Sequence, residues 1–388
     1  MAKDDPLAIL KRGAAQIISE DELRAKLALG RPLRVKLGVD PTSADIHLGH
    51  AVVLRKLRQF QDLGHHAVLI IGDFTGMIGD PSGRSATRPH LTHKEVLANA
   101  QTYREQAFKI LDPGKTETVC NGDWFRSMSY EDVLRLNSRV TMQQVLQRED
   151  FRARIDNQQA IHAHEIQYPI MQGWDSVMVR ADVELGGTDQ LFNILVGRDF
   201  QKEENQAQQV VLTMPLLEGL DGVKKMSKSL GNFVGVSEPA REMFGKLMSI
   251  SDQLMARYYE LVLGRDLPLD SNPLAAKKQL AFELVQTYHS TSVAEKTLND
   301  WNARFSEKRL DEAELPIFAA VADEAVGLVA AAYSQAFAVK KSRAEVSRLI
   351  KQGSVQLDGQ KIVDPKARVS LKSGQVLRLD KTHAVRIK

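Results

Sequence analysis

The sequence predicts an α/β protein with a Rossmann-like, doubly wound parallel sheet, followed by an α-helical domain and a small α+β module. The first half alternates strand-like and helix-like stretches, residues 238–264 and 273–305 have helical patterns, and glycines separate short alternating stretches near the C-terminus. With 388 residues, 43% of them hydrophobic, the chain is too long for one ordinary core. We therefore expect two or three domains.

The first predicted unit is strand, helix, strand. Residues 33–39 place apolar side chains at every second position, which predicts a strand. Residues 48–63 repeat apolar side chains at helical spacing, and Gly64 stands where a C-cap belongs. Residues 67–72 form a continuous apolar run, typical of a strand buried on both faces. Two later strands, 181–185 and 210–217, fit the same sheet, whose ligands would lie beyond the carboxyl ends of its strands.

The remaining segments set the expected domain boundaries. We expect a catalytic domain over residues 1–232, with a mostly helical insertion at about 89–167. A helical domain, 233–320, and a linker, 321–338, should follow. The basic module should occupy 339–388 and begin with an amphipathic helix over 342–352.

Composition excludes several classes of protein. No apolar run reaches the roughly 18 residues that a membrane helix needs, and the N-terminus lacks the apolar stretch of a signal peptide. The single Cys120 excludes an internal disulfide framework and a cysteine-built metal site. We therefore expect a cytoplasmic protein without membrane contact.

The charge is unevenly distributed along the chain. From residue 331 to the end there are 13 Lys and Arg against 4 Asp and Glu, a balance of +9, whereas the preceding residues carry 39 against 45, a balance of −6. A basic end on a mildly acidic body is typical of a nucleic-acid-binding module, but charge alone favours a solubilising tail equally well.

One candidate motif, residues 40–50, follows the first strand and opens the first helix. His47 and His50 share a helix face, and Gly49 lets the backbone approach a ligand closely. Such a helix start suits a phosphate chain. The alternatives are two capping residues or a zinc pair, but only Asp40 or Asp45 could add local ligands. We therefore expect no protein-bound metal.

A second motif, residues 224–231, places three lysines among small hydroxyl residues, which suits a loop that closes on a polyphosphate. Together the two motifs indicate an enzyme that activates a carboxylate with ATP.

Three further segments could line a polar pocket. Asp80, in a turn after the second strand, could hold an ammonium group, with Arg84 and Arg88 nearby as candidate polyphosphate contacts. The side chains of Tyr168, Gln172 and Asp175 share one helix face, which makes a poor core but a suitable pocket wall. A Gly-rich turn at 186–190 carries Asp189, a residue type that accepts ribose hydroxyls.

These five segments, in this order and spacing, resemble the bacterial-type tyrosyl-tRNA synthetases, which are class I aminoacyl-tRNA synthetases. Residues 47–50, HLGH, correspond to the HIGH signature of the family, and residues 225–229 are a complete KMSKS. The resemblance covers essentially the whole chain. Its basic end is similar to a small RNA-binding module shared by a small-subunit ribosomal protein and pseudouridine synthases.

The resemblance implies ATP-dependent attachment of L-tyrosine to tRNA(Tyr) in two steps. Tyrosyl-adenylate forms with release of pyrophosphate, Mg²⁺ being carried by the nucleotide, and the tyrosyl group then passes to the 3′-terminal adenosine. The implied catalytic residues are Thr42, His47, His50, Lys225 and Lys228. The implied ATP-binding residues are Gly49, His50, Arg84, Arg88, Gly187, Asp189, Lys225 and Lys228. The implied tyrosine-binding residues are Gly38, Asp40, Asp80, Tyr168, Gln172, Asp175 and Gln190.

The resemblance also implies a homodimer, joined through about residues 120–165, where Leu134, Val140, Val145 and Leu146 form an apolar set. It implies that the basic module grips tRNA. Its candidate RNA-binding residues are Lys340, Lys341, Arg343, Arg348 and Lys351.

Two positions depart from the pattern of the family. Lys36 stands where many members have a tyrosine that helps to recognise the substrate hydroxyl, and Leu37 replaces a ribose-contacting cysteine of some members. Recognition of the hydroxyl should therefore depend more on Asp175, unless Lys36 has taken over that role.

Three other functions stay open at this point. A tryptophanyl-tRNA synthetase shares the architecture. A small-molecule nucleotidyltransferase would explain the first motif but not the module, and an RNA-binding protein without catalysis would be expected to have lost its motifs.

Overall fold

The computed structural model describes residues 5–41, 45–81, 92–269, 272–306, 315–320 and 324–388. The chain divides into two compact units, Met1–Ala294 and Glu295–Lys388. The boundary expected at residue 232 falls inside the first unit. The candidate residues Thr42, Arg84 and Arg88 lie outside the described residues.

The first unit is built on a six-stranded sheet with the order β1-β6-β5-β2-β3-β4. Its strands are β1 (Gln16–Ile18), β2 (Arg34–Val39), β3 (His66–Ile71), β4 (Thr116–Cys120), β5 (Val183–Gly187) and β6 (Val210–Met214). Five strands are parallel and β1 is antiparallel to β6 at the edge. The chain runs outward from β2 to β4 and then returns to β5 on the other side of β2, so the predicted doubly wound sheet is confirmed.

The sheet also contains two strands that the sequence pattern does not reveal. β4 pairs with β3 inside the stretch expected to be a helical insertion. Its sequence, Thr-Glu-Thr-Val-Cys, is mostly polar, and its residues are half-buried or exposed because it lies at the sheet edge. An edge strand needs no continuous apolar run, and β1 has only three residues, so neither gives a clear signal.

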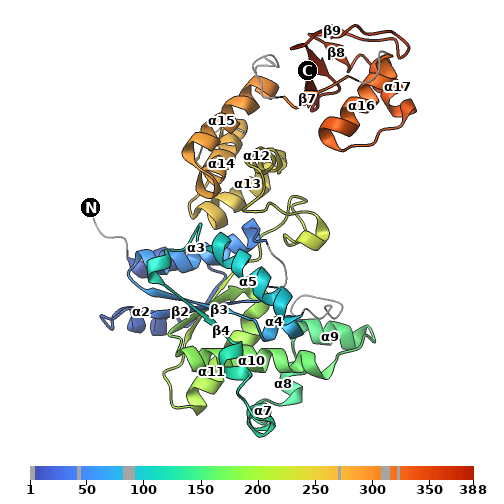
Figure 1. Ribbon diagram of the computed structural model, residues 1–388. Helices are drawn as coiled ribbons and strands as arrows, with labels where there is room; N and C mark the ends of the chain where they lie inside the picture. Colours follow the sequence, from blue (N-terminus) through green and yellow to red (C-terminus); the bar gives the residue numbers. More distant parts are fainter. Residues whose placement is uncertain (1–4, 42–44, 82–91, 270–271, 307–314, 321–323) are drawn as a thin grey trace. The chain divides into compact units, whose positions relative to one another are not determined.

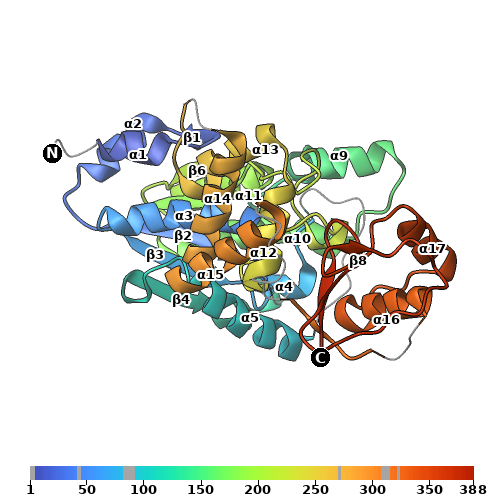
Figure 2. The ribbon, with the colours of Figure 1, turned by 90° about the horizontal axis from the view of Figure 1, so that it is seen from above.

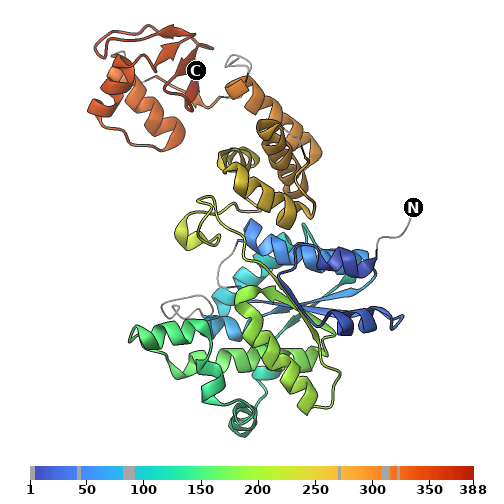
Figure 3. The same cartoon turned by 180° about the vertical axis from the view of Figure 1, so that it is seen from behind.

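Helices cover both faces of the sheet. Figures 1 and 3 show α3 (Leu48–Asp62) on one face and α10 (Ala163–Val179) and α11 (Leu191–Glu203) on the other. The apolar side of α3, which includes Leu54, Leu57 and Phe60, is fully buried. Gly64 follows this helix with a φ of 94°, a left-handed conformation that suits glycine, as expected for the C-cap region.

Further helices and 3₁₀ turns belong to the first unit. They are α1 (Pro6–Lys11), α2 (Glu20–Leu27), α4 (Thr75–Ile78), α5 (His93–Ala107), α6 (Gly122–Phe125), α7 (Tyr130–Asn137), α8 (Met142–Leu146) and α9 (Glu149–Asp156), with the 3₁₀ turns η1 (Pro113–Lys115), η2 (Thr188–Gln190) and η3 (Lys228–Leu230). A helical segment follows: α12 (Ala240–Ser249), α13 (Asp252–Tyr258), the π-helical turn η4 (Tyr259–Leu263), α14 (Pro273–Tyr288) and α15 (Thr291–Trp301), which continues into the second unit. Among the described residues, no helix is long and apolar enough to cross a membrane.

The second unit is a small α+β module. It contains the π-helical turn η5 (Asn302–Ser306), α16 (Ala325–Phe337), α17 (Arg343–Lys351) and the strands β7 (Ile317–Phe318), β8 (Gln356–Leu357), β9 (Gln360–Lys361), β10 (Val376–Arg378) and β11 (Ala384–Ile387), in the order β7-β11-β10-β8-β9. Helices α16 and α17 lie side by side (Figure 2). The predicted helix over 342–352 corresponds to α17. The stretch expected to be a linker contains α16, which shares one apolar core with α17 and the strands.

Candidate active site

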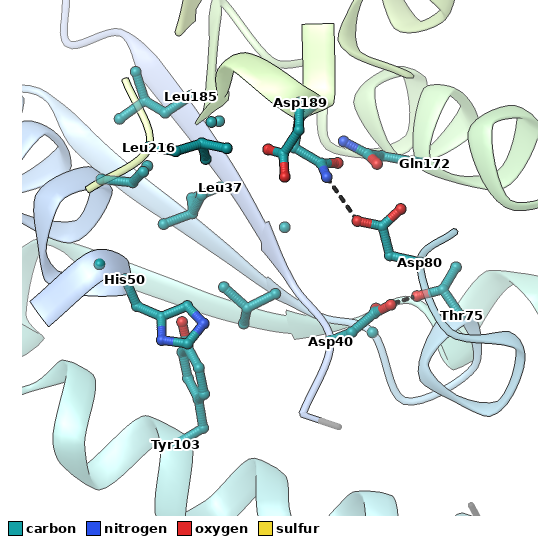
Figure 4. Close-up of a pocket in the computed structure, with 18 of the residues that line it drawn as sticks. Leu37, Asp40, His50, Thr75, Asp80, Tyr103, Gln172, Leu185, Asp189 and Leu216 are labelled. Carbon is teal, nitrogen blue, oxygen red and sulfur yellow. Dashed lines mark hydrogen bonds between the residues drawn. The ribbon is translucent and has the colours of Figure 1, made fainter. Parts of the chain in front are cut away.

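A pocket of about 630 Å³ lies at the carboxyl ends of β2, β3 and β5, where the strand order reverses. Figure 4 shows Asp80, Gln172 and Asp189 gathered on one side of it, with His50 and Tyr103 across from them. The predicted site residues that line the pocket are Gly38, Asp40, His47, Gly49, His50, Asp80, Tyr168, Gln172, Asp175, Gly187, Asp189, Gln190 and Lys225. Side chains from five distant segments thus meet in one cavity, as expected for a ligand at a topological switch point.

The end of β3 helps to shape the pocket. The hydroxyl of Thr75 donates a hydrogen bond of 2.8 Å to Asp40, which follows β2. A Cβ atom at Gly72 would collide with both the Asp40 carboxylate and the Thr75 hydroxyl, so this position requires glycine. Sequence reasoning missed Thr75 and Gly72, because neither belongs to a recognisable motif.

The first motif forms the start of α3, where His47 is the N-cap residue. Its Nδ1 accepts the N–H of Gly49 at 3.2 Å, and its ring lies 3.9 Å from that of His50, centroid to centroid. Burial, aided by His50 and Lys228, lowers the pKa of His47 to about 2, so its imidazole is neutral near pH 7. With Nδ1 as the acceptor, Nε2 carries the proton and can donate to a phosphate oxygen. The capping alternative and the phosphate-binding role are therefore compatible.

The lysine loop is anchored by its methionine. Met226 is buried and its N–H donates to the carbonyl of Leu217 at 2.8 Å. The flanking lysines contact carboxylates: Lys225 Nζ lies 3.3 Å from Asp189 and Lys228 Nζ lies 2.7 Å from Asp45. Both pairs are partly exposed to solvent, so each contributes about 1 kcal/mol or less. A polyphosphate at the pocket mouth can therefore compete for the two ammonium groups at small cost.

Asp175 lies at the buried end of the pocket. One of its oxygens accepts the indole N–H of Trp124 at 3.0 Å, and the other accepts the amide of Asn121 at 3.3 Å. Burial raises the pKa of Asp175 to about 7, although nearby Lys36 and the two hydrogen bonds act in the opposite direction. Asn121 and Trp124, which sequence reasoning missed, thus orient a carboxylate that is only marginally ionised.

Five polar side chains form a connected network beside Asp175. Asn193 donates to Gln172 at 2.8 Å and to Gln190 at 3.3 Å, and Gln190 in turn donates to Asp80 at 2.6 Å. The oxygen of Asn193 accepts from Arg148 at 2.7 Å. Because arginine only donates and an ionised aspartate only accepts, these two ends fix the direction of every amide between them.

Lys36 does not line the pocket. It is fully buried, and its Nζ lies 2.9 Å from Glu184, 2.9 Å from the carbonyl of Gln172 and 2.6 Å from the hydroxyl of Ser176. The alternative in which Lys36 contacts the substrate hydroxyl therefore has no support in the geometry.

No group of three or more His, Cys, Asp or Glu side chains with the arrangement of a metal site occurs within the described part of the chain.

The apolar set expected at a dimer interface is only partly exposed. Val145 is buried and Val140 packs against an internal cluster, whereas Leu134 is 51% exposed. The exposed apolar side chains in this region are Tyr130, Leu134, Met142 and Ile155. Val145 on α8 is buried within the chain, so this member of the expected set is wrong. Val140, between α7 and α8, is half-buried, and the interface itself stays a prediction.

The candidate RNA-binding residues lie on one side of α17 and just before it. Val346 and Ile350 of α17 are buried, while Arg343, Arg348, Lys351 and the preceding Lys340 are exposed. Lys341 is half-buried, with its Nζ 5.0 Å from the centre of the Tyr333 ring. The basic side chains are thus directed away from the core of the module.

Comparisons with known proteins agree with this geometry. The family model described as tRNA synthetases class I (W and Y) matches residues 28–320. The tyrosine–tRNA ligase of Oleidesulfovibrio alaskensis is 49% identical over 100% of this chain and 99% of its own length. That of Shewanella oneidensis is 49% identical over 96% of this chain and 95% of its own.

Solved structures share the fold. The tyrosyl-tRNA synthetase of Archaeoglobus fulgidus, complexed with L-tyrosine, has a TM-score of 0.61 and 21% identity, covering 76% of this chain and 98% of that one. A C-terminally truncated mitochondrial tyrosyl-tRNA synthetase of Aspergillus nidulans has a TM-score of 0.64 and 20% identity, covering 79% and 94%.

Proposed function

We infer that this chain, which belongs to the class I tRNA synthetases of tryptophan and tyrosine, uses ATP to attach tyrosine to tRNA. The observation that carries this inference is the single pocket that joins the helix start at His47, the loop at Lys225 and the buried carboxylate of Asp175. One end of this pocket suits phosphates and the other suits a phenol.

In the first step, the tyrosine carboxylate attacks the α-phosphorus of ATP, and pyrophosphate leaves. His47 Nε2 and Thr42 donate to the departing phosphates, while Lys225, Lys228, Arg84 and Arg88 neutralise their charge. Mg²⁺ arrives with the nucleotide. These groups act by charge stabilisation and positioning, and they form no covalent bond with the substrate.

Tyrosine would lie with its phenol toward Asp175 and its ammonium toward Asp80, Tyr168 and Gln172. Because both Asp175 oxygens already accept N–H groups, a phenolic O–H adds a donor that matches the ionised carboxylate. Phenylalanine would leave that buried charge without this hydrogen bond, which costs roughly 1–3 kcal/mol or more. Gln190, whose amide contacts Asp80, would lie near the substrate carboxylate.

The adenosine would occupy the other half of the pocket. Gly49 and His50 would pack against it, and Gly187 and Asp189 would bind the ribose. A Cβ atom at Gly49 would lie 3.0 Å from the His47 ring, so the glycine keeps this helix start open to the nucleotide.

In the second step, a hydroxyl of the terminal tRNA adenosine attacks the tyrosyl carbonyl of the adenylate, the ester bond forms and AMP leaves. The basic side chains of α17 would contact phosphates of the same tRNA. Such contacts release counterions and make the affinity depend on salt.

A homodimer would form through the exposed apolar side chains near Leu134 and Met142, which a two-fold axis would pair with the same patch of a second copy. We expect the enzyme to act in the cytoplasm.

The function is tested by ATP–pyrophosphate exchange measured separately with tyrosine, tryptophan and phenylalanine. Exchange that depends on tyrosine supports the proposal, and exchange that depends on tryptophan would replace tyrosine with tryptophan as the substrate. No exchange with any of the three would refute it.

A further inference from the structure

A buried ion pair lies directly beneath the pocket, outside its lining. Lys36 on β2 and Glu184 on β5 are both fully buried, and their side chains meet at 2.9 Å. Burying two charges is costly, and an apolar pair of similar volume is often at least as stable. Stability alone is therefore a weak reason for this pair.

Every donor of Lys36 has an acceptor. The ammonium contacts Glu184, the hydroxyl of Ser176 and the backbone carbonyl of Gln172. Two of these partners belong to α10, the helix that forms the polar wall of the pocket. Lys36 thus connects the central strand to the pocket wall at the level of Gln172.

Glu184 also contacts Gln172. Its carboxylate accepts the side-chain amide of Gln172 at 3.3 Å, the hydroxyl of Ser176 at 2.8 Å and the amide of Gln209. An ionised carboxylate can only accept, so it requires the NH₂ end of Gln172 on its own side. The Gln172 oxygen is thereby turned toward Asn193, and Gln172 itself lines the pocket.

We propose that Lys36 and Glu184 are positioning residues for amino-acid recognition, which fix the direction of the Gln172 amide that meets the substrate. Lys36 holds Glu184 in place and ties the helix backbone at Gln172, and Glu184 selects the orientation of the amide. This proposal depends on the proposed function, because it concerns the amino acid that the pocket takes.

The experiment measures KM and kcat for tyrosine, KM for ATP and the preference for tyrosine over phenylalanine, all in pyrophosphate exchange. Lys36→Met should raise the tyrosine KM about tenfold, the effect of losing one hydrogen bond to a charged group, and leave the ATP KM within about twofold. The preference for tyrosine should persist, because Lys36 does not contact the hydroxyl. Glu184→Gln, which places a donor against the Gln172 amide, should act in the same direction.

Lys56→Met provides a matched control. Lys56 is also a buried lysine, but it lies on α3 and donates to the carbonyls of Leu10 and Arg12, away from the pocket lining. This variant should lose thermal stability without a change in the tyrosine KM. If Lys56→Met raised the tyrosine KM as much as Lys36→Met does, the effect of Lys36 would be one of general packing, and the proposal would be overturned.

A double-mutant cycle tests the route through Gln172. In a Gln172→Ala background, Lys36→Met should change the tyrosine KM less than about twofold, because the amide it positions is gone. Additive effects would overturn the proposal, as would a folded Lys36→Met variant with the parent KM. Loss of tyrosine preference at constant KM would instead assign Lys36 to hydroxyl recognition and overturn it too.

If Lys36→Met does not fold, Ser176→Ala takes its place, because it removes only the hydroxyl shared by the ion pair. A rise in tyrosine KM that disappears in the Gln172→Ala background supports the proposal, and an unchanged KM overturns it. Absence of tyrosine-dependent exchange in the parent protein would refute the proposed function itself, a distinct result.

Discussion

The elevated pKa of Asp175 predicts that substrate selection depends on pH. With a pKa of about 7 in the free protein, roughly one-tenth of the Asp175 carboxyl groups are ionised at pH 6 and roughly nine-tenths at pH 8. Tyrosine should bind the ionised form, because both oxygens are already oriented by Trp124 and Asn121 to accept donors. Lowering the pH protonates the carboxyl group and removes the acceptor that the phenol needs.

The expected size of the pH effect follows from these ionised fractions. The value of kcat/KM for tyrosine, which reports on the free enzyme, should fall about tenfold from pH 8 to pH 6. The kcat/KM for phenylalanine, divided by that for tyrosine, should rise as the pH falls, because an uncharged carboxyl group is less costly to leave without a hydrogen-bond partner. The preference for tyrosine should therefore rise with pH. His47 stays neutral throughout this range, so it does not contribute to the profile.

The assay is pyrophosphate exchange at subsaturating amino acid and saturating ATP, at several pH values between 6 and 8. Asp175→Asn is the control, and its weak residual activity should be independent of pH in this interval. A flat tyrosine profile, or a phenylalanine profile that rises as steeply, would refute the assignment of Asp175.

The remaining predictions concern stability, the lysine loop, the dimer and the module. Because the folded-state pKa of Asp175 lies above its ordinary value, the stability that this group contributes is present below about pH 4. It is lost as the pH rises through 7, by roughly 4 kcal/mol in total. The thermal midpoint of the parent should therefore fall more between pH 5 and 8 than that of Asp175→Asn, and equal slopes for the two proteins would contradict this. Lys225→Ala should slow adenylate formation on the order of 100-fold in single-turnover kinetics while tyrosine affinity stays within about twofold; an unchanged rate would remove its role. Leu134→Asp should weaken the dimer at least about tenfold in sedimentation, and a parent that is monomeric at micromolar concentration would exclude the interface. Removing residues 324–388 should leave tyrosine-dependent exchange nearly intact, reduce transfer to tRNA sharply and flatten the salt dependence of tRNA binding; normal charging would assign the module another role.

The boundary of that truncation comes from the structure. A cut at residue 339, the expected start of the module, would leave α16 without its core, because Leu328, Val329 and Tyr333 pack with residues of α17 and the strands. The run Ala-Val-Gly-Leu-Val-Ala-Ala-Ala of α16 carries little charge and no sharp boundary signal, so the sequence suggests a connecting helix. Only the tertiary contacts show which core it belongs to.

Local patterns predicted the parallel core well, because β3 and β6 are almost entirely buried and their sequences are mostly apolar. They also singled out the segments that contain His47, Lys225 and Asp175, and the structure brings these three residues to one pocket. They did not predict the partners of those residues. Asn121 lies 54 positions from Asp175, and no periodicity links two residues that meet only across the sheet edge.

The two glutamine amides that line the pocket depend on contacts that the motif residues do not reveal. An amide has a donor end and an acceptor end of nearly equal shape, so Gln172 and Gln190 can each be placed in two ways. Arg148 fixes Asn193, whose NH₂ group meets the oxygens of both glutamines. Glu184 accepts the NH₂ group of Gln172 and Asp80 accepts that of Gln190, so the two carboxylates hold the glutamines in the same orientation from their other ends. A substrate bound as we propose would meet oriented dipoles whose direction is set by charged side chains behind them. Lys36 is one of those supporting side chains, although its position in the sequence suggests direct contact with the substrate.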